Sequence, residues 1–272
     1  MTTPPRIPVT LSTSSVYPLL PAAAFRIGSQ LGYDGVEVMV LADPVTQDAT
    51  ALRRLARLHE APIRSIHAPT LLVSQRVYGT SDPWEKIDRS IDLALAVECE
   101  TIVVHPPFRW QKEYAREFVE GIAERKNDRG VRQAVENMFP WRAGRTADVP
   151  IYRPSADPVP QPYDNVTLDL SHTATAGDDA LEMQAALGDR LAHVHLADGA
   201  GSMMDEHLVP GRGSQPCAEF LRRLGASDYS GVVAVEVGTR RSGTEGRDAD
   251  LTEALEFARR HLDEGLRARA QG

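Results

Sequence analysis

Short runs of apolar, β-branched residues alternate along the chain with longer segments in which apolar residues recur at helical spacing. The strand-like runs lie near residues 7–11, 35–40, 63–67, 101–105, 131–136, 166–169, 191–196 and 232–237. The helix-like segments lie near residues 20–31, 48–60, 83–98, 112–128, 178–188, 214–224 and 248–268. One helix start is explicit, because Asp82 is a good N-cap residue and Pro83 suits the first helical position. The alternation predicts a parallel sheet covered by helices, and eight such units predict an α/β fold of the (β/α)8 TIM-barrel type.

We expect residues 1–272 to form a single domain, since no linker interrupts the alternation and this length suits one barrel. Two connections are unusually long. Residues 139–163 contain six prolines and little helical pattern, which predicts an ordered excursion, either a cover over the site or a plain surface loop. Residues 197–213 form the second long connection. The tail, residues 267–272, is expected to be frayed.

Potential metal ligands recur where the strand-like runs end, or in the loops that follow them. These nine residues are His67, His105, Glu136, Asp169, His172, His195, Asp205, His207 and Glu236. A single histidine at a strand end is more often a hydrogen-bonded core residue than a ligand. Six of the eight predicted strands end this way, however, and the carboxyl ends of barrel strands meet at one face. The pattern therefore predicts a divalent-metal site, with Zn²⁺ favoured by histidine-rich positions and Mn²⁺ by carboxylate-rich ones.

The spacing within two of these segments adds detail. Asp169 and His172 are three residues apart, which places an imidazole just beyond a strand-end carboxylate. Asp205 and His207 are two residues apart, and an extended loop would point both side chains to the same side.

Amino-acid composition mainly excludes certain classes of protein. A formal net charge of −8 argues against an extended nucleic-acid footprint, and 42% hydrophobic residues suit a packed core. Cys99 and Cys217 cannot make a disulfide framework, which suits a reducing compartment. Residues 1–10 lack an apolar signal core, and no stretch approaches ~18 apolar residues. We expect a cytoplasmic protein without a membrane segment, and the sequence leaves a homo-oligomer open.

Several short motifs, in this order, resemble those of the xylose-isomerase-like TIM-barrel superfamily over essentially the whole chain. They are Gly32-Tyr33-Asp34-Gly35-Val36-Glu37-Val38, His67-Ala68-Pro69, His105-Pro106-Pro107, Glu136-Asn137, Asp169-x-x-His172, His195-Leu196-Ala197-Asp198 and Asp205-Glu206-His207-Leu208-Val209-Pro210-Gly211-Arg212-Gly213. The superfamily contains sugar-phosphate isomerases and epimerases as well as endonuclease IV. Each motif is weak alone, and their order makes the resemblance specific.

The resemblance implies roles for the nine candidate ligands, and a cofactor of one to three divalent metal ions. Glu136, Asp169, His195 and Glu236 match the four-ligand site that epimerases and nucleases share. His67 and His105 match the ligands of a second metal, with Glu136 bridging. His172, Asp205 and His207 match a third site, best known in the nuclease branch.

Further positions are candidates for other roles. Arg109, Trp110 and Arg142 follow strand ends and would line a pocket for a sugar or phosphate. The alternative for these residues, of equal weight, is a role in packing. Arg212 lies between two glycines beside the third site and would hold a phosphate or carboxylate. Glu37 either faces the site or makes an ion pair at the rim, and His193 is expected to be a core histidine.

The favoured function is a metal-dependent isomerase or epimerase of a small sugar, keto-sugar or sugar phosphate. Glu136 and Glu236 would be the catalytic residues, exchanging a proton through an enediolate. The alternative is an endonuclease IV-like DNA-repair phosphodiesterase. Two features weigh against nucleic acid as a partner. Thr70 stands where the nuclease branch has an aromatic residue, and Val38 to Leu52 contains no Lys or Arg. A non-catalytic metal- or ligand-binding barrel is the third interpretation, and a metal-dependent hydrolase or lyase of a small molecule is a related one.

Overall fold

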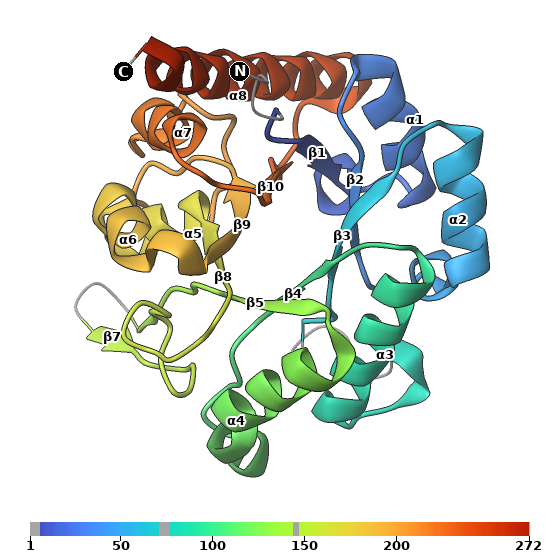
Figure 1. The fold of residues 1–272 in the computed structure, drawn as a ribbon, viewed down its shortest axis with the longest axis vertical. Coiled ribbons are helices and arrows are strands. Elements are labelled where there is room, and N and C mark those ends of the chain that lie inside the picture. Colours follow the sequence, from blue (N-terminus) through green and yellow to red (C-terminus); the bar gives the residue numbers. More distant parts are fainter. Residues whose placement is uncertain (1–5, 71–76, 144–146, 272) are drawn as a thin grey trace.

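A computed structural model describes residues 6–70, 77–143 and 147–271, and a closed barrel of eight parallel strands forms its centre (Figure 1). The barrel strands are β1 (Val9–Ser12), β2 (Val36–Met39), β3 (Ile63–His67), β4 (Thr101–Val104), β5 (Arg132–Glu136), β8 (Val166–Asp169), β9 (Leu191–Leu196) and β10 (Val232–Val235). They close in the order β1-β10-β9-β8-β5-β4-β3-β2. The predicted (β/α)8 barrel is confirmed.

Helices surround the barrel and cover its outer face (Figure 1). They are α1 (Ala22–Leu31), α2 (Ala49–Leu58), α3 (Pro83–Ala96), α4 (Lys112–Arg129), α5 (Leu170–Ala176), α6 (Ala180–Leu187), α7 (Cys217–Ala226) and α8 (Gly243–Gln271). Single 3₁₀ turns are η1 (Thr13–Val16), η2 (Pro44–Gln47), η3 (Val77–Gly79) and η4 (Gly188–Arg190). Because side chains on one strand face meet these helices and those on the other fill the barrel, strands such as β4 are buried along their whole length.

Local sequence explains where several elements begin. The Asp82 carboxylate accepts hydrogen bonds from the backbone N–H groups of Trp84 and Glu85, and Pro83 occupies the first turn of α3, as the sequence predicts. Gly35 lies before β2 at a φ of 149°, where an added Cβ would come within 2.3 Å of the Pro62 carbonyl oxygen. A side chain at this position would therefore push β2 away from the segment that leads into β3.

Where the sequence predicts a frayed tail at residues 267–272, the described residues up to Gln271 belong to the last turns of a helix. Helix α8 continues to Gln271, and Gly265 lets it approach α7, because a Cβ there would lie 2.0 Å from the Arg222 carbonyl oxygen. Near the end of α8, Arg269 donates to the Ser227 carbonyl oxygen and pairs with Asp228. These contacts hold the last turns against the protein.

In the proline-rich segment, the described residues 139–143 and 147–163 contain strands that the sequence did not suggest. An antiparallel pair, β6 (Trp141–Ala143) and β7 (Ala147–Val149), lies outside the barrel (Figure 1). A small apolar cluster joins the segment to the loop after β4; it consists of Phe108, Met138, Ile151 and Tyr152. Backbone hydrogen bonds from Arg109 N–H to the Ile151 carbonyl and from Arg153 N–H to the Pro107 carbonyl reinforce this junction.

The long connection after β9 is also ordered, closed by a bridge between Asp198 and Leu208. A helix that periodicity did not predict, α5, begins directly after β8. Among the described residues, no helix has both the length and the apolar character needed to cross a membrane.

Candidate functional site

The nine candidate ligands, here called the ligand cluster, come together at the carboxyl ends of the barrel strands. His67, Glu136 and Asp169 are the last residues of β3, β5 and β8, while His195 lies in β9. The others follow strands: His105 after β4, His172 in α5, Asp205 and His207 in the loop after β9, and Glu236 after β10. Strand register contributes directly, since Asp169 and His195 are partners across β8 and β9.

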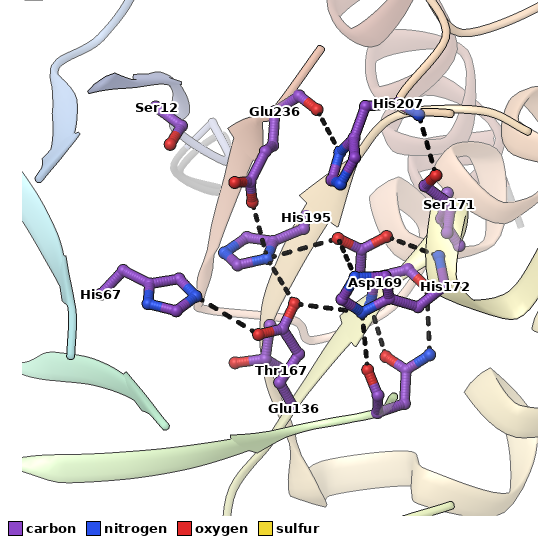
Figure 2. A network of polar contacts seen from close by, with 12 residues as sticks. Ser12, His67, Glu136, Thr167, Asp169, Ser171, His172, His195, His207 and Glu236 are labelled. Atoms are coloured by element: carbon purple, nitrogen blue, oxygen red, sulfur yellow. Dashed lines mark hydrogen bonds and ion pairs between the residues drawn. The ribbon is translucent and has the colours of Figure 1, made fainter. Parts of the chain in front are cut away.

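His195 lies at the centre of the ligand cluster, and three carboxylates converge on its Nδ1 atom (Figure 2). Nδ1 lies 2.9 Å from Glu136 Oε1, 3.0 Å from Glu236 Oε2 and 3.6 Å from Asp169 Oδ2. All four side chains are buried, so these oxygens have little access to water. Three carboxylates on one buried nitrogen form an arrangement that a cation would stabilise.

A second group shares Glu136. Its Oε2 atom lies 2.7 Å from His105 Nε2 and 3.3 Å from His67 Nε2. Although it is buried and close to two ring nitrogens, this oxygen has no hydrogen-bond partner in the described structure. His67, His105 and Glu136 thus present three donor atoms to a common point, as a metal site requires.

A third group surrounds Asp205. Its Oδ2 atom lies 2.7 Å from His207 Nε2 and 3.3 Å from His172 Nε2, while Ser171 Oγ donates to Oδ1 at 2.5 Å. Donor atoms of Asp169, His172 and His207 also lie close enough together to hold one ion. The sequence placed Asp205 and His207 in an extended loop, which is wrong, because His207 has a φ of 45°. The two side chains nevertheless meet.

Three of the histidines are oriented by backbone carbonyls. The Nδ1 atoms of His67, His172 and His207 lie 2.7–2.8 Å from the carbonyl oxygens of Ala68, Asn137 and Glu236, respectively. Because a carbonyl oxygen only accepts, each Nδ1 carries a proton, and in the neutral ring Nε2 then carries a lone pair. These lone pairs face carboxylates. The residues therefore fit a divalent metal, since a lone pair directed at a carboxylate is repulsive unless a proton or a metal lies between them.

Electrostatics in the cluster favour positive charge. Burial lowers the pKa of His172, yet Asp169 and Asp205 hold that pKa well above its ordinary value. Burial also opposes protonation of His207, but Asp205 raises its pKa to about 10. Burial raises the pKa of Glu136, but the charges of His195 and His105 lower it by more. The pKa of Glu136 therefore lies well below its ordinary value. The carboxylates thus attract either protons or a metal.

Asn137 is a residue whose part the sequence did not reveal, although it directly follows Glu136. Its side chain accepts a hydrogen bond from the Asp169 backbone N–H at 2.6 Å and donates to the Asp169 carbonyl oxygen at 3.1 Å. The Asp169 carboxylate in turn caps α5, because Oδ1 accepts from the His172 backbone N–H. This chain of contacts fixes two ligands, one at the end of β8 and one in the first turn of α5.

Asp198 anchors the loop that carries Asp205 and His207. Its carboxylate accepts hydrogen bonds from the backbone N–H groups of Gly211, Gly213 and Gln215 at 2.9–3.0 Å. An added Cβ at Gly213 would lie 2.3 Å from Asp198 Oδ1, so this glycine permits the close approach. The two glycines therefore allow the backbone of this loop to close around the Asp198 carboxylate.

Glu37 lies deeper in the barrel and is not at the rim. Its carboxylate is fully buried beside His193 and Ser65, which with Glu37 we call the inner network. His193 Nε2 and Ser65 Oγ each lie 2.8 Å from Glu37 Oε2, and His195 Nε2 lies 3.1 Å from Oε1. His193 is a buried, hydrogen-bonded core histidine, as the sequence predicts.

Of the four candidates for substrate binding, Arg212 is directed elsewhere. Its guanidinium pairs with Asp250 and Glu253 of α8, two acidic residues that already neutralise its charge, so the predicted phosphate-binding role is not supported. Trp110 is 50% exposed and stacks on Phe108 with ring centroids 4.7 Å apart. The Arg109 side chain is exposed. Arg142 belongs to β6, but its side chain falls outside the described part of the structure.

Tyr152 is an aromatic residue near the cluster that the sequence did not single out. It packs on Phe108, with ring centroids 5.0 Å apart. Burial raises the pKa of Tyr152, and the charges of Glu136 and Asp205 add to that effect. The proline-rich segment therefore brings a phenol within electrostatic range of the ligand cluster.

Comparisons with known proteins agree with this geometry. The sequence model of the family described as Xylose isomerase-like TIM barrel matches residues 25–261. Uncharacterized protein ML2432 of Mycobacterium leprae is 48% identical, and the match covers 95% of this chain and 99% of the relative. Fructoselysine 3-epimerase of Shigella flexneri is 22% identical, over 79% of this chain and 84% of that protein. A D-allulose 3-epimerase structure from Methylomonas sp. superposes with a TM-score of 0.66 at 19% identity, covering 96% of this chain and 99% of that one, which indicates a shared fold.

Proposed function

Because the chain belongs to the xylose isomerase-like TIM-barrel family, we propose that it is a metal-dependent isomerase or epimerase of a small sugar or keto-sugar. The observation that carries the proposal is the convergence of Glu136, Asp169 and Glu236 on His195 Nδ1. With His195, these residues would hold a divalent metal. When bound, the metal would supply positive charge that polarises a substrate carbonyl.

Glu136 and Glu236 are the proposed proton carriers. They reach His195 from β5 and β10, two strands that β8 and β9 separate in the barrel. One carboxylate would remove a proton from the carbon beside the carbonyl, leaving a planar enediolate, and the other would return a proton from the opposite face. Ser14 Oγ donates to Glu236 Oε1 at 2.9 Å and would hold that carboxylate in position.

Residues around the cluster would bind the substrate. The exposed face of Trp110 and the nearby Trp141, with ring centroids 6.4 Å apart, would offer apolar surface to a sugar ring. Arg109 and Arg142 remain the candidates for a phosphate if the substrate carries one. The names of the two epimerases favour a ketose with a stereocentre beside the carbonyl.

Two further groups of the ligand cluster would hold additional ions. One consists of His67, His105 and Glu136, and the other consists of Asp169, His172, Asp205 and His207. These additional groups also support the second candidate, an endonuclease IV-like phosphodiesterase. The loop after β2 weighs against it, since residues 38–52 contain no Lys or Arg to bind phosphate and its acidic residues Asp43 and Asp48, which cap η2 and α2, would repel DNA.

Solvent-exchange NMR tests the proposal. Protein loaded with Mn²⁺ or Zn²⁺ is incubated with a panel of ketoses in D₂O, and deuterium at the carbon beside the carbonyl is measured after metal removal. We expect exchange and epimerisation with the wild type, loss of both with Glu236→Gln, and wild-type exchange with Arg212→Ala. Absence of exchange across the panel, or full exchange in Glu236→Gln, would contradict the proposal. Cleavage of an abasic-site duplex that is lost in His67→Ala would favour the nuclease.

A further inference from the structure

We propose that Glu37 is a positioning residue that directs Nδ1 of His195 toward the metal; this inference rests on the proposed metal site. Glu37 lies on β2, which is not a neighbour of β9 in the barrel. Its carboxylate therefore reaches His195 across the barrel interior. The contact joins His195 Nε2 to Glu37 Oε1 at 3.1 Å.

The two ring nitrogens of His195 face different partners. Nδ1 faces the oxygens of the ligand cluster, and among the charged groups of the described residues Nε2 forms an ion pair with Glu37. A neutral imidazole has one proton, and a carboxylate can only accept. Glu37 therefore favours the form with hydrogen on Nε2, which leaves the lone pair of Nδ1 for a metal. A carboxylate behind a ligating histidine fixes its orientation and increases its basicity.

The 3.1 Å contact has the length of an ion pair, and the ring N–H is not aligned on the oxygen, since neither atom has a hydrogen-bond partner in the described structure. The charge of Glu37 is consequently the larger part of its effect on His195.

Glu37 is itself held rigidly. Ser65 Oγ donates to Oε2, His193 Nε2 contacts the same oxygen, and all three side chains are fully buried. Register supports the arrangement, because Glu37 and Ser65 are partners across β2 and β3. A carboxylate fixed on one oxygen by two groups has little freedom to turn the other oxygen away from His195. These contacts make Glu37 a support for the ligand rather than a residue that meets substrate.

The test compares zinc affinity in the wild type and in Glu37→Gln, measured by competition with a chromophoric chelator. Gln keeps the size of the side chain but removes its charge, and we expect zinc to bind roughly 10–100-fold more weakly. Ser65→Ala is the matched control, since it removes a contact to Oε2 without touching His195, and its loss of affinity should be clearly smaller. Thermal melts of the metal-free variants check that both are folded.

A spectroscopic measurement separates positioning from a purely structural role. In zinc-loaded protein with ¹⁵N-labelled histidine, the Nε2–H signal of His195, assigned by its loss in His195→Asn, should lie downfield and move upfield in Glu37→Gln. Folded Glu37→Gln that binds zinc as tightly as the wild type, with an unmoved signal, would overturn the inference. Wild-type zinc binding without any epimerisation would instead contradict the proposed function and leave this inference intact.

Discussion

Two groups of buried histidines and carboxylates lie one above the other in the barrel, and they differ in whether neighbouring carboxylates outweigh burial in setting the histidine pKa. In the inner network, burial lowers the pKa of His193 despite the neighbouring Glu37. In the ligand cluster, carboxylates overcome burial and raise the pKa of His172 and His207. His193 lies two residues deeper along β9 than His195, so a short step along one strand separates the two behaviours.

The difference lies in how carboxylates and donors are matched. Glu37 is a single carboxylate whose Oε2 atom is bonded by one imidazole, His193, and one hydroxyl, Ser65, while its Oε1 atom faces the His195 ring. The ligand cluster holds four carboxylates, and three of its imidazoles already give their Nδ1 proton to backbone carbonyls. A buried carboxylate with enough donors is a structural group, whereas carboxylates that face lone pairs require a cation.

The largest effect should come from Glu136→Gln, because Glu136 contacts histidines of all three groups in the ligand cluster. We expect metal binding to collapse and turnover to fall by about 10²–10⁴-fold, the usual range for a proton-transfer residue. Metal content by elemental analysis and the solvent-exchange rate check this. Glu37→Gln is the control for the inner network and should retain more of both. Equal effects in the two variants would remove the distinction between the two groups.

Metal removal should have the second-largest effect, which we expect to see in the stability of the protein. A ligand that binds only the folded state raises the free energy of unfolding by about 3–4 kcal/mol when its free concentration is roughly 100 to 1,000 times its dissociation constant. A chelator should therefore lower the melting temperature of the wild type, and added Zn²⁺ or Mn²⁺ should restore it. Glu136→Gln should melt at the same temperature with and without chelator. An unchanged wild-type melting temperature would argue that the ligand cluster, like the inner network, needs no metal for its stability.

A pH series sharpens the comparison further. The pKa of His207 rises from about 6.5 in an unfolded chain to about 10 in the folded one, mainly through Asp205 acting against burial. The folded state therefore keeps a proton that the unfolded chain releases between these values. This contribution to stability is complete below about pH 6.5 and disappears toward pH 10. Thermal melts of metal-free protein should show the decline, and His207→Gln should flatten it. A wild-type profile with no decline would contradict the assignment.

The smallest effect should come from Arg212→Ala, outside both groups. Arg212 is about half exposed and pairs with Asp250 and Glu253, so its removal should destabilise the protein by about 1 kcal/mol or less. The Michaelis constant for any substrate found should stay unchanged. A large rise in that constant would show that Arg212 turns toward the site when substrate binds.

Much of the fold was predictable because periodicity is a local property. The eight barrel strands and the capped start of α3 follow from runs and residues that the sequence displays directly. Helix α5 is too short for its periodicity to register, and the β6–β7 pair lies among prolines that suggested only a loop. The length of α8 depends on packing against α7, which no local pattern encodes.

The site was predictable from the sequence to a similar extent as the fold. Residue types at strand ends indicated the members of the ligand cluster, and strand register then brings Asp169 beside His195. The direction of a side chain is not a local property, so the sequence did not reveal that Arg212 turns toward α8 or that Glu37 reaches across the barrel. Tyr152 approaches the cluster through contacts between two loops, which sequence spacing does not show.

The most direct measurement is anomalous diffraction from crystals of the full chain grown with Zn²⁺ or Mn²⁺. We expect a strong peak bounded by Glu136, Asp169, His195 and Glu236, with no peak in the inner network between Glu37 and His193. Absence of a peak among those four ligands at saturating metal would show that the ligand cluster is not a metal site.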